Sequence, residues 1–483
     1  MALGLFSEEA RKWWTLAAVA VGLFMIMLDN TVVNVALPSM ARDLGAGLSE
    51  LEWIVTGYAL TFASLMLTGG KLADLLGRRL IFVTGLAIFT AASLACGLAE
   101  SENALIAARV VQGAGAALMN PATLSIIAAT FPPHQRGTAI GIWAGVSALA
   151  LAIGPLIGGL LTERLDWSWI FFVNVPIGIL GIVASFVLIP ESKDESHEQR
   201  LDFPGLLTSG LGLFALTYGL IEANTYGWTS TRILVAFGIA IVMLVAFIVL
   251  EMHQRLPMLD LSLFQNRTYA GANVAILLVA LAMFGVFFFV SLYMQGILGY
   301  SAVQAGAAFL PMTVLIILTA PIAGRVSDRI GSRWLMTTGM LLVSAQLLYF
   351  SRMDENSVYL DLLPALMAGG IGMALVMTPS AAAAVRALPV DKSGVGSAVL
   401  NAFRQVGGSM GIALMGAIMA HEVGGVKGPA VFRDPTVFVD AFSTTLTVAA
   451  GIALAGAVVS FVLVRPHELG EPGPPREAVT EVG

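Results

Sequence analysis

The chain has 483 residues, of which 57% are hydrophobic and only 12% are charged, with a mean hydropathy of +0.86. Soluble domains carry about 25% charged residues, so this chain has too few charges for a water-facing surface and is predicted to lie in a membrane. The net charge of −6 without a basic tract argues against nucleic-acid binding. The single cysteine, Cys96, excludes disulfides within the chain, and no histidine lies near a second ligand at metal spacing.

Long apolar segments follow one another along the chain, and each has the length of a membrane-spanning helix. A span needs about 20 apolar residues. The first segment, near 13–37, is too long for the apolar region of ~7–15 residues in a cleaved signal peptide, so we interpret it as a retained span. Thirteen further segments lie near 51–69, 80–99, 104–130, 137–162, 168–189, 203–222, 232–251, 269–293, 303–323, 334–351, 360–385, 394–420 and 440–464. The sequence therefore predicts an all-α integral membrane protein with 14 transmembrane helices.

Lysine and arginine residues are distributed unequally between the predicted loops. With a cytoplasmic N-terminus, 17 of them fall in inner segments, 6 in outer segments and two within spans. Cytoplasmic loops carry the excess of basic residues in membrane proteins. We therefore expect a multi-pass protein of the cell (inner) membrane with both termini in the cytoplasm.

A ten-residue hinge sequence, G-x-x-x-D-x-x-G-x-R, occurs twice in the chain. The copies cover 70–79 and 324–333, a shift of 254 residues, and Gly154 further along matches Gly411 at a shift of 257. The first copy joins predicted spans 2 and 3, and the second joins spans 10 and 11, so two extra spans separate two similar halves. The predicted domains are an N-terminal six-helix bundle (1–190), an inner linker with a two-helix insert (191–268), a C-terminal six-helix bundle (269–465) and a disordered cytoplasmic tail (466–483).

Two charged residues of the first half lie deep within predicted spans, Asp29 in span 1 and Arg109 in span 4. An intramembrane carboxylate costs on the order of +2.5 to +3.5 kcal/mol on insertion scales and seldom faces lipid. Arginine keeps its charge in proteins and needs a partner, for which Asp29, backbone carbonyls or Gln112 are candidates. At the shift of 257 the counterpart of Arg109 is Leu366, so the second half lacks this charge. We interpret Asp29 as a proton carrier or a site for a cationic substrate, with Arg109 in coupling; packing roles are the alternatives.

Span 5 contains a glycine- and proline-rich motif that favours close packing. Small residues four apart let helices approach, and an internal proline bends a helix. We predict a bendable contact across the two halves, with ordinary small-residue packing as the alternative. The predicted gating and latch residues are Gly154, Pro155, Gly158 and Gly159 in this motif, Gly70, Asp74, Gly77, Arg78 and Arg79 in the first hinge, and Gly324, Asp328, Gly331 and Arg333 in the second.

Several further polar and apolar positions are candidates for the site. Glu222, near the end of span 7, is a possible second titrating group, although its side chain could also reach the membrane interface. Arg404 in span 13 is interpreted as a structural tie to a neighbouring helix. The candidates for the wall of a substrate cavity are Asn34, Tyr58, Gln112, Asn120, Phe284, Met377 and Asn401, with core packing as the alternative for the methionine and the phenylalanine.

Six motifs in order resemble the major facilitator superfamily, and more narrowly its fourteen-helix drug:H+ antiporter family of multidrug and quaternary-ammonium exporters. They lie at 28–38, 70–79, 109–113, 154–159, 169–176 and 201–205. The resemblance implies two six-helix bundles around a central cavity that is exposed alternately to each side. It also implies that Asp29 is the proton-linked acid and that Gly154 and Pro155 mark an exporter. Ser168 departs from the pattern, because relatives often carry arginine there.

These observations predict proton-coupled efflux, or antiport, of amphipathic and cationic organic compounds. The alternative is a proton-independent transporter of lipids or lipid-like metabolites, which the same fold could host. An enzyme is not expected, because no catalytic cluster of Ser, His and Asp or of Cys and His occurs in the spans. The expected partners are an amphipathic small molecule, protons and membrane lipids, with no cofactor, no nucleic acid and a monomeric state.

Overall fold

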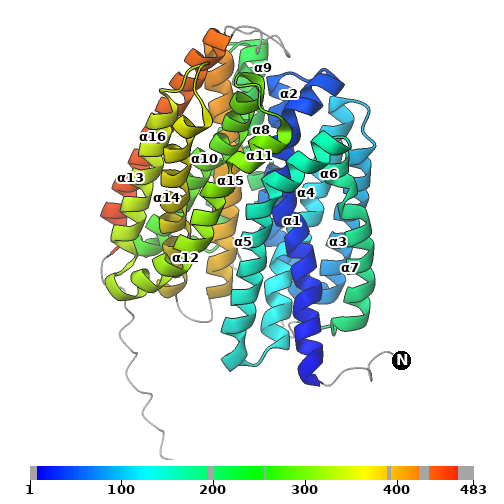
Figure 1. The fold of residues 1–483 in the computed structure, drawn as a ribbon. Helices are drawn as coiled ribbons and strands as arrows, with labels where there is room; N and C mark the ends of the chain where they lie inside the picture. The colour runs from blue at the N-terminus through cyan, green and yellow to red at the C-terminus, as the bar shows by residue number, and fades with distance from the viewer. Residues whose placement is uncertain are drawn as a thin grey trace, which may run out of the picture.

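The computed structural model describes residues 8–193, 201–254, 257, 259–388, 393–423 and 435–465 (Figure 1). Every regular element within these ranges is a helix. A helix satisfies its backbone polar groups internally, which lipid requires. Twelve helical segments of the described chain are long and apolar enough to cross a membrane. The all-α membrane fold is therefore confirmed, whereas the count of fourteen spans stays a prediction, as does the tail, which lies outside the described residues.

The helices begin and end close to the predicted apolar segments. In the first half they are α1 (Glu8–Leu44), α2 (Leu48–Leu76), α3 (Arg78–Gly97), α4 (Glu102–Thr130), α5 (Pro133–Arg164), α6 (Trp169–Phe172) and α7 (Asn174–Leu188). The later ones are α8 (Phe203–Tyr226), α9 (Thr231–His253), the 3-10 helix η1 (Leu261–Gln265), α10 (Arg267–Gly296), α11 (Ala302–Ala308), α12 (Leu310–Ile330), α13 (Ser332–Phe350), α14 (Tyr359–Arg386), α15 (Ser393–Glu422) and α16 (Pro435–Leu463). Predicted spans 6 and 10 each consist of two consecutive helices, α6 with α7 and α11 with α12.

The two halves pack their helices in the same pairs. In the first half α2 and α3 both pack on α4, α1 packs on α5, and α3 packs on α7. In the second half α12 and α13 both pack on α14, α10 packs on α15, and α13 packs on α16. Helices in corresponding positions of the sequence therefore make corresponding contacts, as expected for a duplicated architecture.

The halves lie side by side (Figure 1), and α1 meets α10 through hydrogen bonds from Ser291 and Gln295 to the backbone carbonyls of Asn34 and Val35. Two further seams join them. In one seam α2 of the first half packs against α15 of the second, and in the other α5 packs against α11. Helix α8, which pairs with α9, contacts both α2 and α15. The amide of Asn224 on α8 donates to the carbonyl oxygen of Ala417 on α15 at 2.6 Å, so α8 bridges the first seam.

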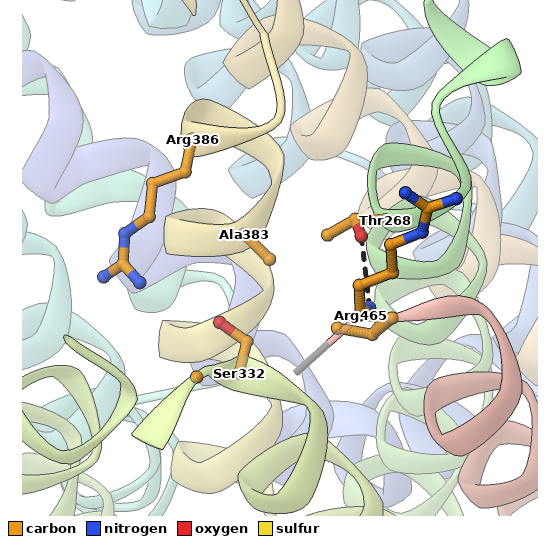
Figure 2. A pocket seen from close by; sticks show the side chains of 7 residues that line it. Thr268, Ser332, Ala383, Arg386 and Arg465 are labelled. Carbon is orange, nitrogen blue, oxygen red and sulfur yellow. Dashed lines mark hydrogen bonds between the residues drawn. The ribbon is translucent and has the colours of Figure 1, made fainter. Parts of the chain in front are cut away.

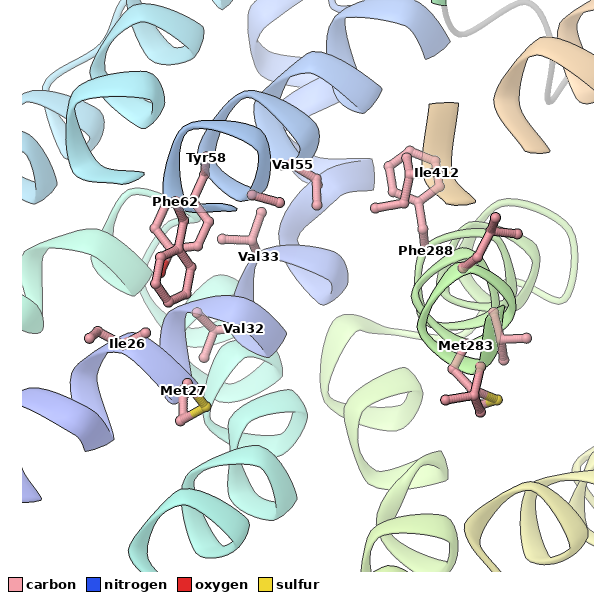
Figure 3. Close-up of a cluster of buried hydrophobic side chains, with 14 of the residues drawn as sticks. Ile26, Met27, Val32, Val33, Val55, Tyr58, Phe62, Met283, Phe288 and Ile412 are labelled. Atoms are coloured by element: carbon pink, nitrogen blue, oxygen red, sulfur yellow. The ribbon is translucent and has the colours of Figure 1, made fainter. Parts of the chain in front are cut away.

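Buried apolar side chains from both halves face each other near the centre of the molecule. Figure 3 shows Val33 of α1 and Tyr58 and Phe62 of α2 opposite Phe288 of α10 and Ile412 of α15. These side chains are almost fully shielded from solvent. Without a hydrophobic driving force inside lipid, close packing of this kind holds the halves together.

Candidate functional site

A cavity of about 1920 Å³ lies between the two halves. Its walls come from α1, α2, α4, α5, α10, α12, α14 and α15, with the end of α9 and η1 at its near-side rim. We call the side of the molecule at which α1 begins the near side, and the opposite side the far side. The lining residues of α2 start only at Met66, and those of α15 end at Gln405, so the cavity runs from mid-helix to the near side. The far-side parts of both helices pack together instead.

Five of the seven predicted cavity residues line this cavity. They are Asn34, Asn120, Phe284, Met377 and Asn401. The other two predictions are wrong, because Tyr58 and Gln112 do not belong to the lining. Both are buried behind the wall, where Tyr58 covers the guanidinium of Arg109 and Gln112 bonds to Asp29. Sequence position alone placed them in the right bundle, but the rotation of each helix decides which side chains reach the cavity.

Asp29 and Arg109 form a closed polar cluster between α1 and α4. Arg109 Nη1 lies 2.5 Å from Asp29 Oδ2 and 2.7 Å from Gln112 Oε1. Gln112 Nε2 donates to Asp29 Oδ1 at 3.0 Å and to Ser93 Oγ at 2.9 Å. Each carboxylate oxygen of Asp29 thus accepts one hydrogen bond, and both charged side chains are about 1% exposed.

The surroundings of Arg109 explain how a full charge is held inside the protein. Its Nε donates to the carbonyl oxygen of Ile54 at 3.0 Å, and its guanidinium carbon lies 4.2 Å from the centre of the Tyr58 ring. The candidate partners from the sequence, an acid, an amide and a backbone carbonyl, are therefore all used at once. A buried ion pair of this kind is retained only when hydrogen bonds satisfy both ions.

Asp29 is not part of the cavity wall. Its two oxygens are occupied by Arg109 and Gln112, so a cationic substrate in the cavity could reach the carboxylate only by displacing them. The expected contact between Asp29 and a cationic substrate is therefore not present in this conformation. The acid stands next to the cavity rather than in it.

Arg404, which we expected to be a structural tie, lines the cavity instead. No hydrogen bond or ion pair joins its side chain to another residue of the described chain. The other charged lining residues lie at the near-side ends of helices; they are Lys71, Asp74, Asp202, Glu251 and Asp260. Arg404 is the twelfth residue of α15, with Asn401 and Gln405 beside it in the wall. The deep part of the described cavity therefore carries a positive charge.

The first hinge is closed by two acidic residues. Asp74 accepts from Nε and Nη2 of Arg78, both at 3.1 Å. Glu191, after α7, accepts from the backbone N–H groups of Arg79 and Leu80 at 3.0 and 3.2 Å, which caps the start of α3. Gly77 between the helices has φ of +127°, a conformation that favours glycine.

The second hinge uses the same residue pattern with different partners. Asp328 pairs with Arg386 at the end of α14, and Ser327 and Ser332 share a hydrogen bond of 2.8 Å. Figure 2 shows Arg386 and Ser332 on one side of a small pocket and Thr268 and Arg465 on the other, where the backbone N–H of Arg465 donates to Thr268 Oγ1. The guanidinium of Arg333 lies 4.0 Å from the centre of the Phe461 ring. Gly331 again has a positive φ, +83°, so the turn is shared although the ion pairs are not.

The glycine motif of α5 contacts two different helices. Gly154 and Gly158 pack against Thr31 and Val32 of α1, which belongs to the same half. Gly159 reaches the other half, because the backbone of α11 at Ala302 occupies the space that a Cβ would need. The predicted contact across the halves is therefore made by Gly159 and not by Gly154 or Gly158.

Pro155 completes this second seam. Its carbonyl oxygen lies where a Cβ on Gly306 of α11 would be placed. Glycines on both sides therefore let the backbones of α5 and α11 touch.

Glu222 of α8 is held by α2. Its Oε1 accepts from Trp53 Nε1 at 3.1 Å and from Ser49 Oγ at 3.3 Å. The carboxylate therefore points into the far-side contact between α8 and α2 rather than toward the membrane interface. Whether it titrates stays a prediction.

Glu52 is a buried acid that the sequence analysis did not single out. It lies on α2 at the edge of the predicted span 51–69, beside the half-buried Glu50. In the structure it is 2% exposed and lies against Gly416 of α15. The repeat gave a usable signal, since the position equivalent to Glu52 at the 254-residue shift is Gly306.

The fold and the central cavity define a polytopic membrane transporter. The family model of the Major Facilitator Superfamily matches residues 19–411 and 272–482. The match covers most of the chain, and the chain belongs to the Major Facilitator Superfamily.

Similar proteins support a narrower placement within that family. The chain is 37% identical to the tetracenomycin C resistance and export protein of Streptomyces glaucescens, over 86% of this chain and 78% of that protein. It is 36% identical to a puromycin resistance protein of Streptomyces alboniger, over 94% of this chain and 92% of that protein. A multidrug resistance protein of Mycobacterium tuberculosis is also 36% identical, over 87% of this chain and 78% of that protein.

Solved structures with the same fold include two transporters. A bacterial homologue of the human lysosomal transporter Spinster, in an inward-facing and occupied conformation, matches with a TM-score of 0.67 and 16% identity, over 95% of this chain and 98% of that one. The peptide transporter POT in complex with sulfate matches with a TM-score of 0.66 and 15% identity, over 95% and 99%. At these identities the likeness shows the fold alone.

Proposed function

We propose that this protein is a proton-coupled exporter of amphipathic organic compounds that works by alternating access. The observation that carries this proposal is the buried Asp29–Arg109 pair beside a large cavity open at one side. Relatives named for drug resistance and export support the direction of transport. The proton couple is our inference from the buried acid, because an ionisable group inside a membrane is costly unless it functions.

The near side is the cytoplasmic side in this proposal, and the chain has fourteen spans. The excess of basic residues in near-side loops supports the orientation. Helices α13 and α15, of 19 and 30 residues, would join the twelve apolar segments as spans. Both termini are then cytoplasmic, α8 and α9 are the insert between two six-helix bundles, and the described conformation is open to the cytoplasm.

A proton at Asp29 would change the balance of charge inside the first bundle. Protonation removes the counter-charge of Arg109, and a buried pair that loses one partner is destabilised by about 3–5 kcal/mol. About 1.4 kcal/mol changes an equilibrium tenfold, so this is enough to shift the population between two conformations. Arg109 also bonds to Ile54 on α2, which gives the charge a direct contact with a helix of the seam.

The charge of the substrate follows from the cavity wall rather than from Asp29. The preference for a cationic substrate was based on the acid, which is shielded by its partners. The deep wall instead offers the guanidinium of Arg404, with the amides of Asn401 and Gln405 beside it. A guanidinium binds carboxylates and other oxygen acceptors. We therefore propose a substrate with a negatively charged or strongly accepting group on an apolar body.

The coupling role is tested by Asp29→Asn in proteoliposomes with an imposed pH gradient. The amide keeps the size and one acceptor oxygen for Arg109, but it cannot release a proton. We expect gradient-driven export to fall by at least ~100-fold while facilitated exchange at equal pH continues. Asp43→Asn, at the exposed far end of the same helix, is the matched control. Export that follows the gradient at the wild-type rate in Asp29→Asn would exclude Asp29 as the carrier.

The substrate charge is tested with one amphipathic scaffold in anionic, neutral and cationic forms. We expect the anionic form to bind most tightly to the wild type and ~10-fold or more weakly to Arg404→Gln, with partial recovery in Arg404→Lys, because only the guanidinium pairs with two oxygens at once. Lys71→Gln at the rim is the control. Tighter binding of the cationic form would contradict this proposal and favour the cationic substrate predicted from the sequence. Transport of lipids that does not depend on pH would favour the alternative function, a proton-independent transporter of lipids or lipid-like metabolites.

A further inference from the structure

Glu52 lies where the two halves meet on the far side. It is the fifth residue of α2, and its carboxyl group occupies the space that a Cβ on Gly416 of α15 would need. The residue is 2% exposed. Its side chain is therefore part of the surface on which α2 closes against the second half.

The carboxyl group of Glu52 has no partner in the described chain. No hydrogen bond or ion pair reaches its oxygens, and the nearby hydroxyl of Thr56 donates to the backbone carbonyl of Glu52 instead. An isolated carboxylate shielded from water is strongly disfavoured, whereas the protonated acid is tolerated. The closed seam is therefore compatible with Glu52 only in its neutral form.

The charged groups around Glu52 do not supply a counter-ion. The charged side chains that act on Glu52 are both acidic; they are Glu50 on the same helix and Glu222 on α8. Arg109 of α4 bonds to α2 at Ile54, but its charge is paired with Asp29 of α1. The charged or titratable residues at the far end of α15 are His421 and Glu422, which are exposed.

At the equivalent contact in the repeat no side chain lies between the two backbones, and the carboxylate of the same seam, Glu163 of α5, is exposed and accepts from the backbone N–H of Val303 at 3.0 Å. At the shifts that relate the halves, Glu52 corresponds to Gly306 and Gly416 corresponds to Gly159. Gly306 and Gly159 bring the backbones of α11 and α5 into direct contact. The α2–α15 seam thus carries the carboxyl group of Glu52 at the position where the α5–α11 seam has Gly306. Packing of the two helices therefore does not by itself require an acid at this position.

We infer that Glu52 is a second proton-binding site, which holds a proton while α2 and α15 are packed on the far side. When the helices separate, the carboxyl group reaches the far-side solution and exchanges its proton, and it must be neutral again before the seam closes. Only an O–H bond forms or breaks in this step. The inference rests on the proposed alternating access and adds a proton requirement to closure of the far side.

The position of Glu52 along α2 is consistent with a proton route from the far-side solution to Asp29. Tyr58, which covers Arg109, is six residues further along α2, or about 9 Å at 1.5 Å per residue. Glu52 therefore stands between the far-side surface and the Asp29 cluster. A proton that enters from the far side meets Glu52 first.

The test measures closure directly, with spin labels at the exposed positions Asp43 and Glu422, one in each half. The labelled pair D43C and E422C is placed in a Cys96→Ala background, in lipid nanodiscs. In the otherwise unchanged protein we expect the closed far-side population to fall as pH rises. In Glu52→Gln, which is neutral at every pH, the far side is expected to stay closed across the same range.

A matched control and a second variant keep the test decisive. Glu100→Gln removes an exposed carboxyl group from the far-side loop after α3 and is expected to keep the pH dependence. Glu52→Asp keeps a titrating group, and we expect it to keep the dependence with a shifted midpoint. An unchanged pH profile in Glu52→Gln, or no pH dependence in the parent, would overturn the inference. Neither readout requires transport, so a failure of proton-coupled export in proteoliposomes is a separate result.

Discussion

The two seams between the halves occupy equivalent places in the repeat but are built differently. In the α5–α11 seam, Gly159 and Gly306 let two backbones touch without any side chain between them. In the α2–α15 seam, a glycine faces the carboxyl group of Glu52. The first seam also contains Glu163 of α5, which accepts from the backbone N–H of Val303 of α11 at 3.0 Å. In our proposal the second seam depends in addition on whether Glu52 holds a proton. We therefore expect the two seams to respond differently to pH, because the carboxyl group of Glu52 has no hydrogen-bond partner in the described chain whereas that of Glu163 has one.

The same asymmetry extends to the rest of the first half. Asp29 and Arg109 also lie there, and the second half has Leu366 in place of the arginine. The wall of the second half contributes Arg404 to the cavity. We therefore expect proton chemistry to depend on the first bundle and recognition of the substrate's charge to depend on the second.

Between the two seams, the larger effect is expected from Gly159→Leu, which breaks the contact between the backbones of α5 and α11. The larger side chain cannot fit against the backbone of α11, and overpacking costs about 1–3 kcal/mol. Export should fall ~10-fold or more, and far-side spin labels should report an open state at every pH. Gly451→Leu on α16, where an added Cβ meets no atom, is the control. Full closure in Gly159→Leu would show that α5 and α11 need not touch.

A smaller effect is expected from Gly416→Ala, which crowds the other seam. One methyl group would press on the carboxyl group of Glu52, so closure should weaken by a few-fold. Glu52→Ala should remove the conflict, and the double variant should close as well as Glu52→Ala alone. The double-mutant cycle in the spin-label populations measures this coupling. Additive effects would mean that the two side chains do not meet.

Much of the fold could be predicted because membrane spans have a strong and simple signal. Length and hydropathy placed the ends of the helices within about seven residues of those observed, and the repeated hinge predicted two extra helices between the halves. The Asp29–Arg109 pair could also be predicted, since two unlike charges in one apolar bundle have few other partners. These inferences depend on composition and on sequence order, which the chain shows directly.

The remaining errors concern which face of a helix meets which neighbour. Tyr58 and Gln112 lie on predicted spans but point to Arg109 and Asp29 instead of the cavity. Gly154 packs within its own half, although it lies close to Gly159, which crosses to the other. Glu52 was missed because a carboxyl near a helix end is ordinarily solvated, and only the packing of α15 buries it.

Helix α8 has a consequence for how far the far side can open. Its Glu222 is bonded to Trp53 of α2, and its Asn224 is bonded to Ala417 of α15, so one helix is fastened to both sides of the same seam. For α2 and α15 to separate, the hydrogen bond of α8 to one of these two helices must break. A compound that binds beneath α8 and reinforces both attachments is expected to hold α2 against α15 from the lipid side, without entering the central cavity.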